Sequence, residues 1–179
     1  GAQDLACINV GRGIGAGLII DGELYLGHDF ISGEIGHMAI DLHGPTCSCG
    51  NNGCLQTFAT GPAIAKRMRA KLEEGESSSL SVMLGDGSCS EITGEEVFEA
   101  AKAGDSLAQQ VLQEAGEYLG IGLTNLIHII NPEKIVLSGG VINAREFLLD
   151  TVQETIQKRA LTEKAKKTVI TVSSFGSYA

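Results

Sequence analysis

The sequence lacks any apolar run that approaches the roughly 20 residues needed to cross a membrane, so we expect no membrane-spanning segment. It also lacks a basic N-terminal region followed by an apolar stretch, and we therefore expect no secretory signal. Positive charge is scarce, because 13 lysine and arginine residues face 22 aspartate and glutamate residues and the formal net charge is −9. This balance argues against a segment that holds duplex DNA by itself, since that affinity comes largely from cations on phosphates. Internal repeats and low-complexity segments are absent as well.

The composition is otherwise ordinary for a globular protein, with 43% apolar and 20% charged residues. At 179 residues the chain is long enough for one well-formed core, and we treat it as a single domain. Lysine and arginine gather in two local clusters, which we interpret as solvated faces near helix ends rather than as contacts with nucleic acid. The clusters are Lys66, Arg67, Arg69 and Lys71, and Lys158, Arg159, Lys164, Lys166 and Lys167.

The most informative stretch is 33–56, which reads GEIGHMAIDLHGPTCSCGNNGCLQ. It holds His37, Cys47, Cys49 and Cys54, with nine, one and four residues in the gaps between them. The intervening loop is rich in glycine and asparagine and turns easily, so the four side chains can meet at one point. Three thiolates and an imidazole are the ligand set of a closed, tetrahedral, structural zinc site. We therefore predict a zinc ion that shapes this loop rather than one that activates water.

Reduced, buried thiols and disulfides are the alternatives for these cysteines. Cys47 and Cys49 are one residue apart, which is a poor disulfide geometry, and a structural disulfide would need an oxidising compartment. A metal-binding cysteine cluster without a secretory signal points to the cytoplasm. Cys7 lies in an apolar segment and is interpreted as a small buried hydrophobe. Cys89 is too isolated in the sequence to join the metal set.

The first thirty residues predict strands around a glycine-rich turn. Residues 5–10 (LACINV) form a short apolar strand, and 11–17 carry glycine at alternate positions. Backbone so rich in glycine usually lies very near a ligand or another chain segment. The apolar runs 18–20 and 23–26 are joined by Asp21-Gly22, which predicts a β-hairpin.

Helical spacing of apolar residues predicts three helices in the middle of the chain: 54–72, 93–104 and 105–131. Gly61-Pro62 is expected to divide the first of them. Thr93 and Glu96 have the spacing of a capping box at the start of the second. The polar segment 73–90 is expected to be a surface loop.

The third predicted helix contains Gly116, Gly120 and Gly122, each of which costs about 1 kcal/mol in helix propensity. Glycines at this cost indicate close packing, either against another element of the chain or at a subunit interface. Farther on, a strand at 134–138, a helix at 144–160 and a strand at 168–173 predict an α/β unit with parallel strands. No helix follows to cover the last strand, so we expect the C-terminal end to be incomplete.

Four features together resemble the ROK family of sugar kinases and sugar-responsive transcriptional repressors: GEIGH, the CxCGxxGC spacing, the GRGIGAG turn with its hairpin, and NPEKIVLSGGV. The resemblance covers residues 1–179. It implies an α/β fold of the actin-like ATPase, ribonuclease-H-like type, with a mixed sheet, flanking helices and a zinc-stapled loop. The chain would be the second, C-terminal lobe, truncated at both ends. The family's catalytic aspartate, the base for the sugar hydroxyl, belongs to the first lobe, so no catalytic residue is expected here.

The resemblance also implies which residues bind ligands. Zinc maps onto His37, Cys47, Cys49 and Cys54, and sugar maps onto Glu34, His37 and Gln56. A carboxylate accepts hydrogen bonds from two sugar hydroxyls, and an imidazole held by a metal on one nitrogen presents the other in a fixed direction. In the kinases of the family, ATP with Mg²⁺ would use the phosphate turns. The residues that match those turns are Gly11, Arg12, Gly13, Gly15, Gly139 and Gly140.

Two departures from the kinase pattern favour the repressor branch. Kinases of the family usually carry threonine where this chain has Arg12, and glutamate where it has Gln56. Losing the hydroxyl removes a phosphate or metal contact, whereas an amide in place of the carboxylate still binds sugar. We therefore expect the sugar-binding effector lobe of a repressor that reaches DNA through an N-terminal domain outside this chain.

An ATP-dependent hexose kinase of the glucokinase or N-acetylhexosamine type is the alternative. A zinc-stapled scaffold without a small ligand is a third possibility. A homodimer is expected from the family resemblance and from the glycine-rich helix.

Overall fold

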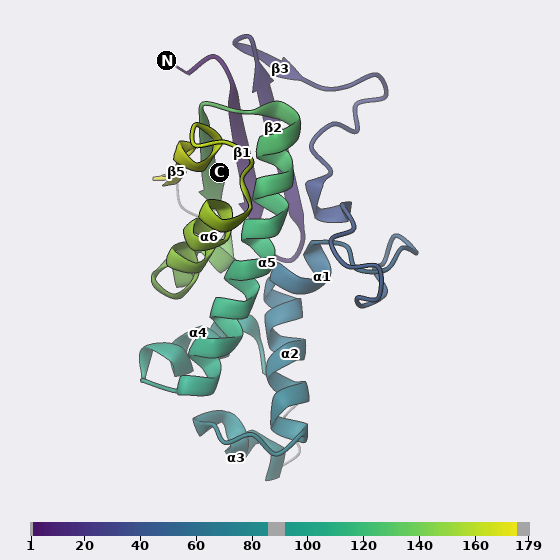
Figure 1. Cartoon of the computed structure of the whole chain (residues 1–179). Coiled ribbons are helices and arrows are strands. Elements are labelled where there is room, and N and C mark those ends of the chain that lie inside the picture. Colours follow the sequence, from purple (N-terminus) through teal and green to yellow (C-terminus); the bar gives the residue numbers. More distant parts are fainter. Residues whose placement is uncertain (1, 86–91, 175–179) are drawn as a thin grey trace.

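The computed structural model describes residues 2–85 and 92–174. Five strands form one sheet in the order β3-β2-β1-β4-β5 (Figure 1). Strand β2 pairs antiparallel with β1 and β3, whereas β4 pairs parallel with β1 and β5. The expected mixed sheet is therefore confirmed. The bounds are β1 Leu5–Val10, β2 Ile14–Ile20, β3 Glu23–Tyr25, β4 Lys134–Ser138 and β5 Val169–Val172.

The hairpin between β2 and β3 turns at Asp21 and Gly22, as predicted. Both residues have positive φ, 53° and 79°, and Ile20 pairs with Glu23 directly across the turn. Two positive φ angles in a two-residue loop are those of a type I′ turn, whose twist matches that of the strands it joins.

One face of the sheet is buried beneath helices α5 (Ser106–Ile130) and α6 (Arg145–Arg159) (Figure 1). Along β1, Ala6, Ile8 and Val10 have no exposed surface, whereas Cys7 and Asn9 between them are exposed. Successive residues of a strand point to opposite faces, so this alternation identifies the covered face. The interpretation of Cys7 as a buried hydrophobe is therefore wrong: it occupies the uncovered face.

Helix α5 needs its glycines to pack against other elements of the same chain. A Cβ on Gly120 would stand 2.6 Å from Cβ of Thr155 on α6, and one on Gly122 would stand 2.4 Å from Leu55. Gly116 is equally close to the backbone of α6, at 2.8 Å from the carbonyl oxygen of Leu148. All three glycines are buried, so intramolecular packing accounts for them and they do not support a subunit interface.

The remaining helices extend away from the sheet beside α5 (Figure 1). Thr60 separates the first two, and its hydroxyl accepts a hydrogen bond from the amide of Ala63, which confirms the predicted division. Thr93 and Glu96 form the predicted capping box of α4. The helices are α1 Gln56–Ala59, α2 Gly61–Glu73, α3 Val82–Gly85 and α4 Gly94–Lys102, with short 3₁₀ turns η1 Ile35–His37, η2 Ser79–Ser81, η4 Gly140–Ala144 and η5 Ala165–Lys167.

In its described part, the segment 73–90 has more regular secondary structure than the surface loop that we expected. It contains η2 and α3, and Asp105 at the N-terminus of α5 accepts hydrogen bonds from the hydroxyls of Ser78 and Ser79, each at 2.7 Å. Cys89 lies outside the described residues. Within those residues, no helix has the length and apolarity to cross a membrane.

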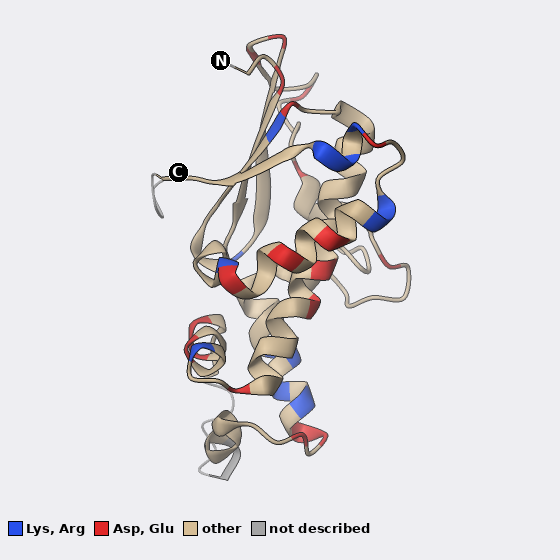
Figure 2. Cartoon of the chain, turned by 60° about the vertical axis from the view of Figure 1, so that its left-hand side comes forward, with Lys and Arg blue, Asp and Glu red and all other residues tan. Residues whose placement is uncertain are grey.

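The first basic cluster is not the solvated face that we inferred. The Arg67 side chain keeps 17% of its exposure, lies 5.3 Å above the Tyr118 ring and pairs with Glu114 at 3.5 Å. Arg69 donates to the carbonyl oxygen of Ile92 at 2.7 Å. Both guanidinium groups hold α2 to its neighbours. Elsewhere in the described chain, lysine and arginine are spread over several elements (Figure 2).

Candidate metal centre and ligand site

Two glycines of the GEIGH segment hold the loop 33–56 against the sheet. The amide of Ala16 on β2 donates to the carbonyl oxygen of Gly33 at 2.8 Å. A Cβ on Gly33 would stand 1.8 Å from the carbonyl oxygen of Ala16, and one on Gly36 would stand 2.2 Å from that of Ile14. Gly33 also has a φ of 90°, which favours glycine. This close backbone contact fixes the position of the His37 backbone at the end of η1.

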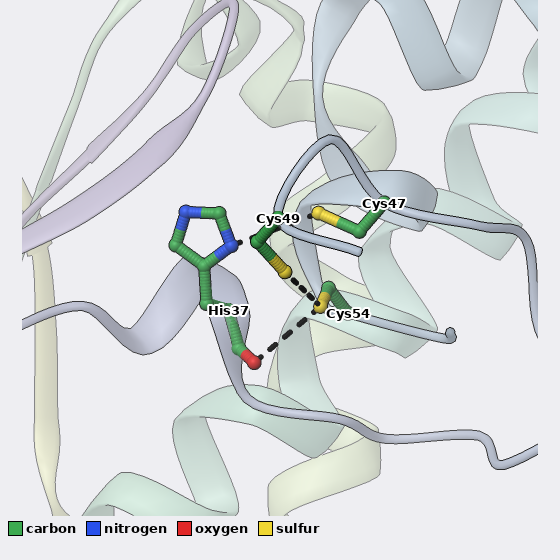
Figure 3. Close-up of side chains that lie close together, drawn as sticks. All are labelled: His37, Cys47, Cys49 and Cys54. Atoms are coloured by element: carbon green, nitrogen blue, oxygen red, sulfur yellow. Dashed lines mark hydrogen bonds between the residues drawn. The ribbon is translucent and has the colours of Figure 1, made fainter. Parts of the chain in front are cut away.

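The four predicted metal ligands lie together, with their ligand atoms all within 4.8 Å of one another (Figure 3). Nδ1 of His37 is 3.6 Å from Sγ of Cys47, and the Sγ atoms of Cys49 and Cys54 are 3.7 Å apart. Cys47 and Cys54 are buried, whereas Cys49 is exposed. The four described cysteines are free, so a disulfide does not link them.

These separations fit a tetrahedral metal ion. Ligands about 2.0–2.3 Å from a central zinc in tetrahedral geometry lie roughly 3.5–3.8 Å from one another. The two distances above fall within that range, the other separations stay within 4.8 Å, and a Cys₃His set is the composition of structural zinc sites. Among the described groups of histidine, cysteine and acidic residues, this one therefore has both the donor chemistry and the spacing for zinc.

The thiols of the cluster also need a cation to ionise together. A hydrogen bond from the backbone of Cys49 lowers the pKa of Cys47 to about 6, with the Gln56 amide adding to the effect against the opposing influence of burial. Burial, together with the neighbouring thiols of Cys49 and Cys47, raises the pKa of Cys54 to about 12. One sulfur ionises readily while another resists a second negative charge. A divalent cation at the centre would remove that resistance.

His37 presents its two nitrogens to different partners. Nδ1 faces the thiols, and Nε2 lies 3.9 Å from a carboxylate oxygen of Glu34. The Glu34 side chain keeps 63% of its exposure and that of His37 36%. The structure therefore places Glu34 and the outer nitrogen of His37 at the surface, next to the cysteine cluster.

Gln56 points toward the cysteine cluster, which sequence reasoning did not anticipate. Its Nε2 donates to Sγ of Cys47 at 3.2 Å. Its Oε1 lies 3.6 Å from the position of a Cβ on Gly13. Gln56 thus lies between the metal ligands and the glycine turn.

The residues expected to bind phosphate do not all line one site. Gly11, Arg12 and Gly140 line one cavity of about 980 Å³. A Cβ on Gly139, whose φ is 95°, would stand 2.5 Å from the carbonyl oxygen of Val10, so this glycine serves the packing of β4 against β1. Gly13 neighbours Gln56, and Gly15 lies in β2 with open space where a Cβ would point.

The cavity is completed by the N-termini of two helices. Gly61 begins α2 and Gly94 begins α4, and both line the cavity together with Thr93. Backbone N–H groups at such ends favour anions. Sequence reasoning did not assign Thr93 or Gly94 to a site, although the capping-box signal had already identified that helix start.

A five-stranded mixed sheet with helices packed on one face places this chain in the class of proteins with an actin-like ATPase fold. The chain belongs to the ROK family: the sequence model of the family matches residues 1–179. It is 35% identical over 159 residues to the DNA-binding transcriptional dual regulator NagC of Escherichia coli strain K12, covering 89% of this chain and 37% of that protein. It is also 34% identical over 178 residues to a glucokinase of Halalkalibacterium halodurans, covering 99% of this chain and 53% of that enzyme.

Solved structures from both branches superpose equally well. A ROK family transcriptional regulator described as a homolog of the E. coli MLC protein has a TM-score of 0.83 and 35% identity, covering 95% of this chain and 41% of that one. A ROK family glucokinase from Streptomyces griseus, in complex with glucose and AMPPNP, has a TM-score of 0.84 and 28% identity, covering 98% and 57%. The chain thus spans between about a third and somewhat over half of the length of these relatives.

Proposed function

We propose that residues 1–179 form the C-terminal, sugar-binding effector lobe of a ROK transcriptional repressor, with a structural zinc ion beside the sugar pocket. The zinc is held by His37, Cys47, Cys49 and Cys54. The proposal is carried by the convergence of these four ligand atoms within 4.8 Å. Zinc on Nδ1 of His37 would orient its Nε2, which together with Glu34 would bind the hydroxyls of a hexose or acetylated hexosamine.

Sugar binding would act by changing how this lobe meets the rest of the polypeptide. A sugar held more tightly in one arrangement of the lobes shifts the equilibrium toward that arrangement. A DNA-binding domain N-terminal to this chain would respond to that shift. The net charge of −9 agrees with DNA contact residing elsewhere. A cytoplasmic location and a homodimer stay predictions, the latter from the family resemblance alone.

The second candidate is the C-terminal lobe of an ATP-dependent sugar kinase. It is favoured by the cavity of about 980 Å³ that Gly11, Arg12 and Gly140 share with the N-termini of α2 and α4. ATP phosphates with Mg²⁺ would use these turns, and an aspartate outside this chain would act as base. Arg12, in place of the threonine usual in kinases, offers a cation but no hydroxyl for a phosphate-bound metal.

Calorimetry and an ATP assay on the polypeptide that contains this chain would separate the two candidates. We expect micromolar-to-millimolar binding of glucose or N-acetylglucosamine and negligible transfer from ATP. Turnover with any hexose at roughly 1–100 per second, the ordinary range of kinases, would overturn the repressor assignment. Absence of binding to every hexose and acetylated hexosamine tested would overturn the sugar site itself.

A further inference from the structure

The Gln56 side chain joins the candidate zinc ligands to the glycine turn. Its Nε2 donates to the buried sulfur of Cys47 at 3.2 Å, while its Oε1 faces Gly13. Exchanging the two amide atoms would bring an acceptor against the sulfur, so the observed orientation is the one a thiolate favours.

The backbone of Gln56 is held firmly enough to aim this amide. Gln56 begins α1 directly after Leu55, a fully buried side chain that packs against Gly122 of α5. Its carbonyl oxygen accepts a hydrogen bond from the Thr60 hydroxyl at 2.7 Å. The backbone of Gln56, two residues after Cys54, is therefore held in place, and its side chain extends to the sulfur of Cys47.

In the observed orientation of the side chain, a neutral amide suits the contact with Cys47 better than a carboxylate. Three thiolates and a neutral imidazole around Zn²⁺ leave one net negative charge, which an N–H donor stabilises. A carboxylate has no proton to donate near neutral pH and would add a second negative charge next to a buried sulfur. Groups that hydrogen-bond to metal ligands orient them and tune the metal.

We propose that Gln56 is a positioning residue of the zinc centre, which holds the Cys47 sulfur in its ligand geometry through an N–H···S hydrogen bond. This inference rests on the proposed zinc site. It assigns Gln56 a role other than the sugar contact that the family resemblance implies. Only Oε1 would then be left for a sugar hydroxyl.

The test compares Gln56→Met and Gln56→Glu with wild type in zinc affinity, measured by competition with a chromophoric chelator. Methionine keeps the length of the side chain but removes the donor, and glutamate also adds charge. Groups that hydrogen-bond to metal ligands are typically worth about 10–100-fold in metal affinity, so we expect a loss of about tenfold for methionine. Glutamate, which is usual at this position in the family's kinases, can turn its carboxylate away from the sulfur, so we expect it to lose the same hydrogen bond and about the same affinity as methionine. Gln153→Met and Gln153→Glu, on the exposed side of α6, are matched controls expected to leave affinity unchanged.

A spectroscopic readout separates positioning from a general loss of stability. In the Co²⁺-loaded protein, the sulfur-to-cobalt charge-transfer band reports hydrogen bonding to the thiolates. We expect this band to shift in both Gln56 variants and not in the Gln153 variants, with far-UV circular dichroism unchanged throughout. Wild-type zinc binding, with Gln56 variants that keep the wild-type affinity and an unshifted band, would overturn this inference alone. Failure of the wild-type chain to bind zinc would overturn the zinc proposal and the inference together.

Discussion

Nε2 of His37 lies 3.9 Å from a carboxylate oxygen of Glu34, on the side of the imidazole opposite the cysteine sulfurs. One ring thus connects a candidate metal centre to an acid at the surface. This connection explains physically how a structural ion can serve ligand binding, since it fixes the direction of a hydrogen-bonding nitrogen without contacting the ligand.

The first prediction separates the acid from the metal. Glu34→Gln removes the charge of the carboxylate that we propose accepts hydrogen bonds from sugar hydroxyls, a type of hydrogen bond worth about 1.5–3 kcal/mol. We expect calorimetry to show sugar affinity lowered by about 10–100-fold while zinc content stays at the wild-type value. Glu117→Gln, on the exposed side of α5, controls for the change in net charge. Unchanged sugar affinity in Glu34→Gln would remove this residue from the pocket.

The second prediction concerns loss of the metal. Cys54→Ser replaces a proposed zinc ligand that has no exposed surface, so we expect elemental analysis to find little zinc in the variant and about one ion per wild-type chain. Thermal unfolding should occur at a lower temperature, because metal bound only to the folded state stabilises it. Far-UV circular dichroism should keep most of its helical signal, since the core that α5 and α6 form with the sheet consists mainly of residues outside the loop, which contributes Ile35 and Leu55 to it.

Cys7→Ser is the matched control for that experiment. Cys7 lies on the uncovered face of β1, away from the cysteine cluster, and its replacement should leave zinc content unaffected. Equal zinc content in Cys54→Ser and Cys7→Ser would contradict the assignment of Cys54 as a ligand.

The third prediction tests the packing of α5 on α6. Gly120→Ala would place a Cβ 2.6 Å from Cβ of Thr155 and 3.0 Å from the carbonyl oxygen of Val152. Overpacking costs about 1–3 kcal/mol, and the gain in helix propensity returns up to about 1 kcal/mol. We expect urea denaturation to show a net loss of about 1–2 kcal/mol. Gly15→Ala, where a Cβ meets nothing within 4 Å, should be close to neutral. A stable Gly120→Ala variant would mean that the helices can separate at little cost.

Local patterns were sufficient to predict several elements. Asp21-Gly22 specifies a hairpin turn through its own conformational preference, and Thr93 with Glu96 closes a capping box within four residues. The convergence of the four zinc-ligand side chains could also be predicted, because the short gaps between them leave little freedom to place them apart.

Contacts between distant segments could not be predicted. Periodicity marks Cys7 as alternating with buried residues, but it does not say which face of the sheet is covered. Arg67 reads as a surface cation, yet Glu114 and Tyr118 of α5 enclose it. Gln56 looked like a sugar ligand through resemblance, whereas its contact with Cys47 depends on how the loop folds back.

The contact between Asp105 and the segment before α4 makes stability depend on pH. Burial is the largest single influence on this carboxyl and raises its pKa, but the hydrogen bonds from Ser78, Ala108 and Ser79 together outweigh burial and lower the pKa from 3.8 to about 2. A group whose pKa is lower in the folded than in the unfolded state stabilises the fold when ionised. The stabilisation is therefore complete above about pH 5 and is lost as pH falls from about 4 toward 2.

Asp105→Asn tests this dependence, because asparagine also caps helices but carries no charge. The carboxyl is partly exposed, so we expect a loss of only about 1 kcal/mol or less at pH 7, measured by urea denaturation. Comparing variant and wild type at each pH cancels any shared effect of metal loss in acid. The difference should shrink between pH 5 and pH 3, because protonation removes from the wild type the charge that the variant lacks. Asp150→Asn, an exposed acid on α6, should change stability little at pH 7. A gap between Asp105→Asn and wild type that stays constant down to pH 3 would mean that the hydrogen bonds from Ser78 and Ser79 do not depend on the carboxylate charge.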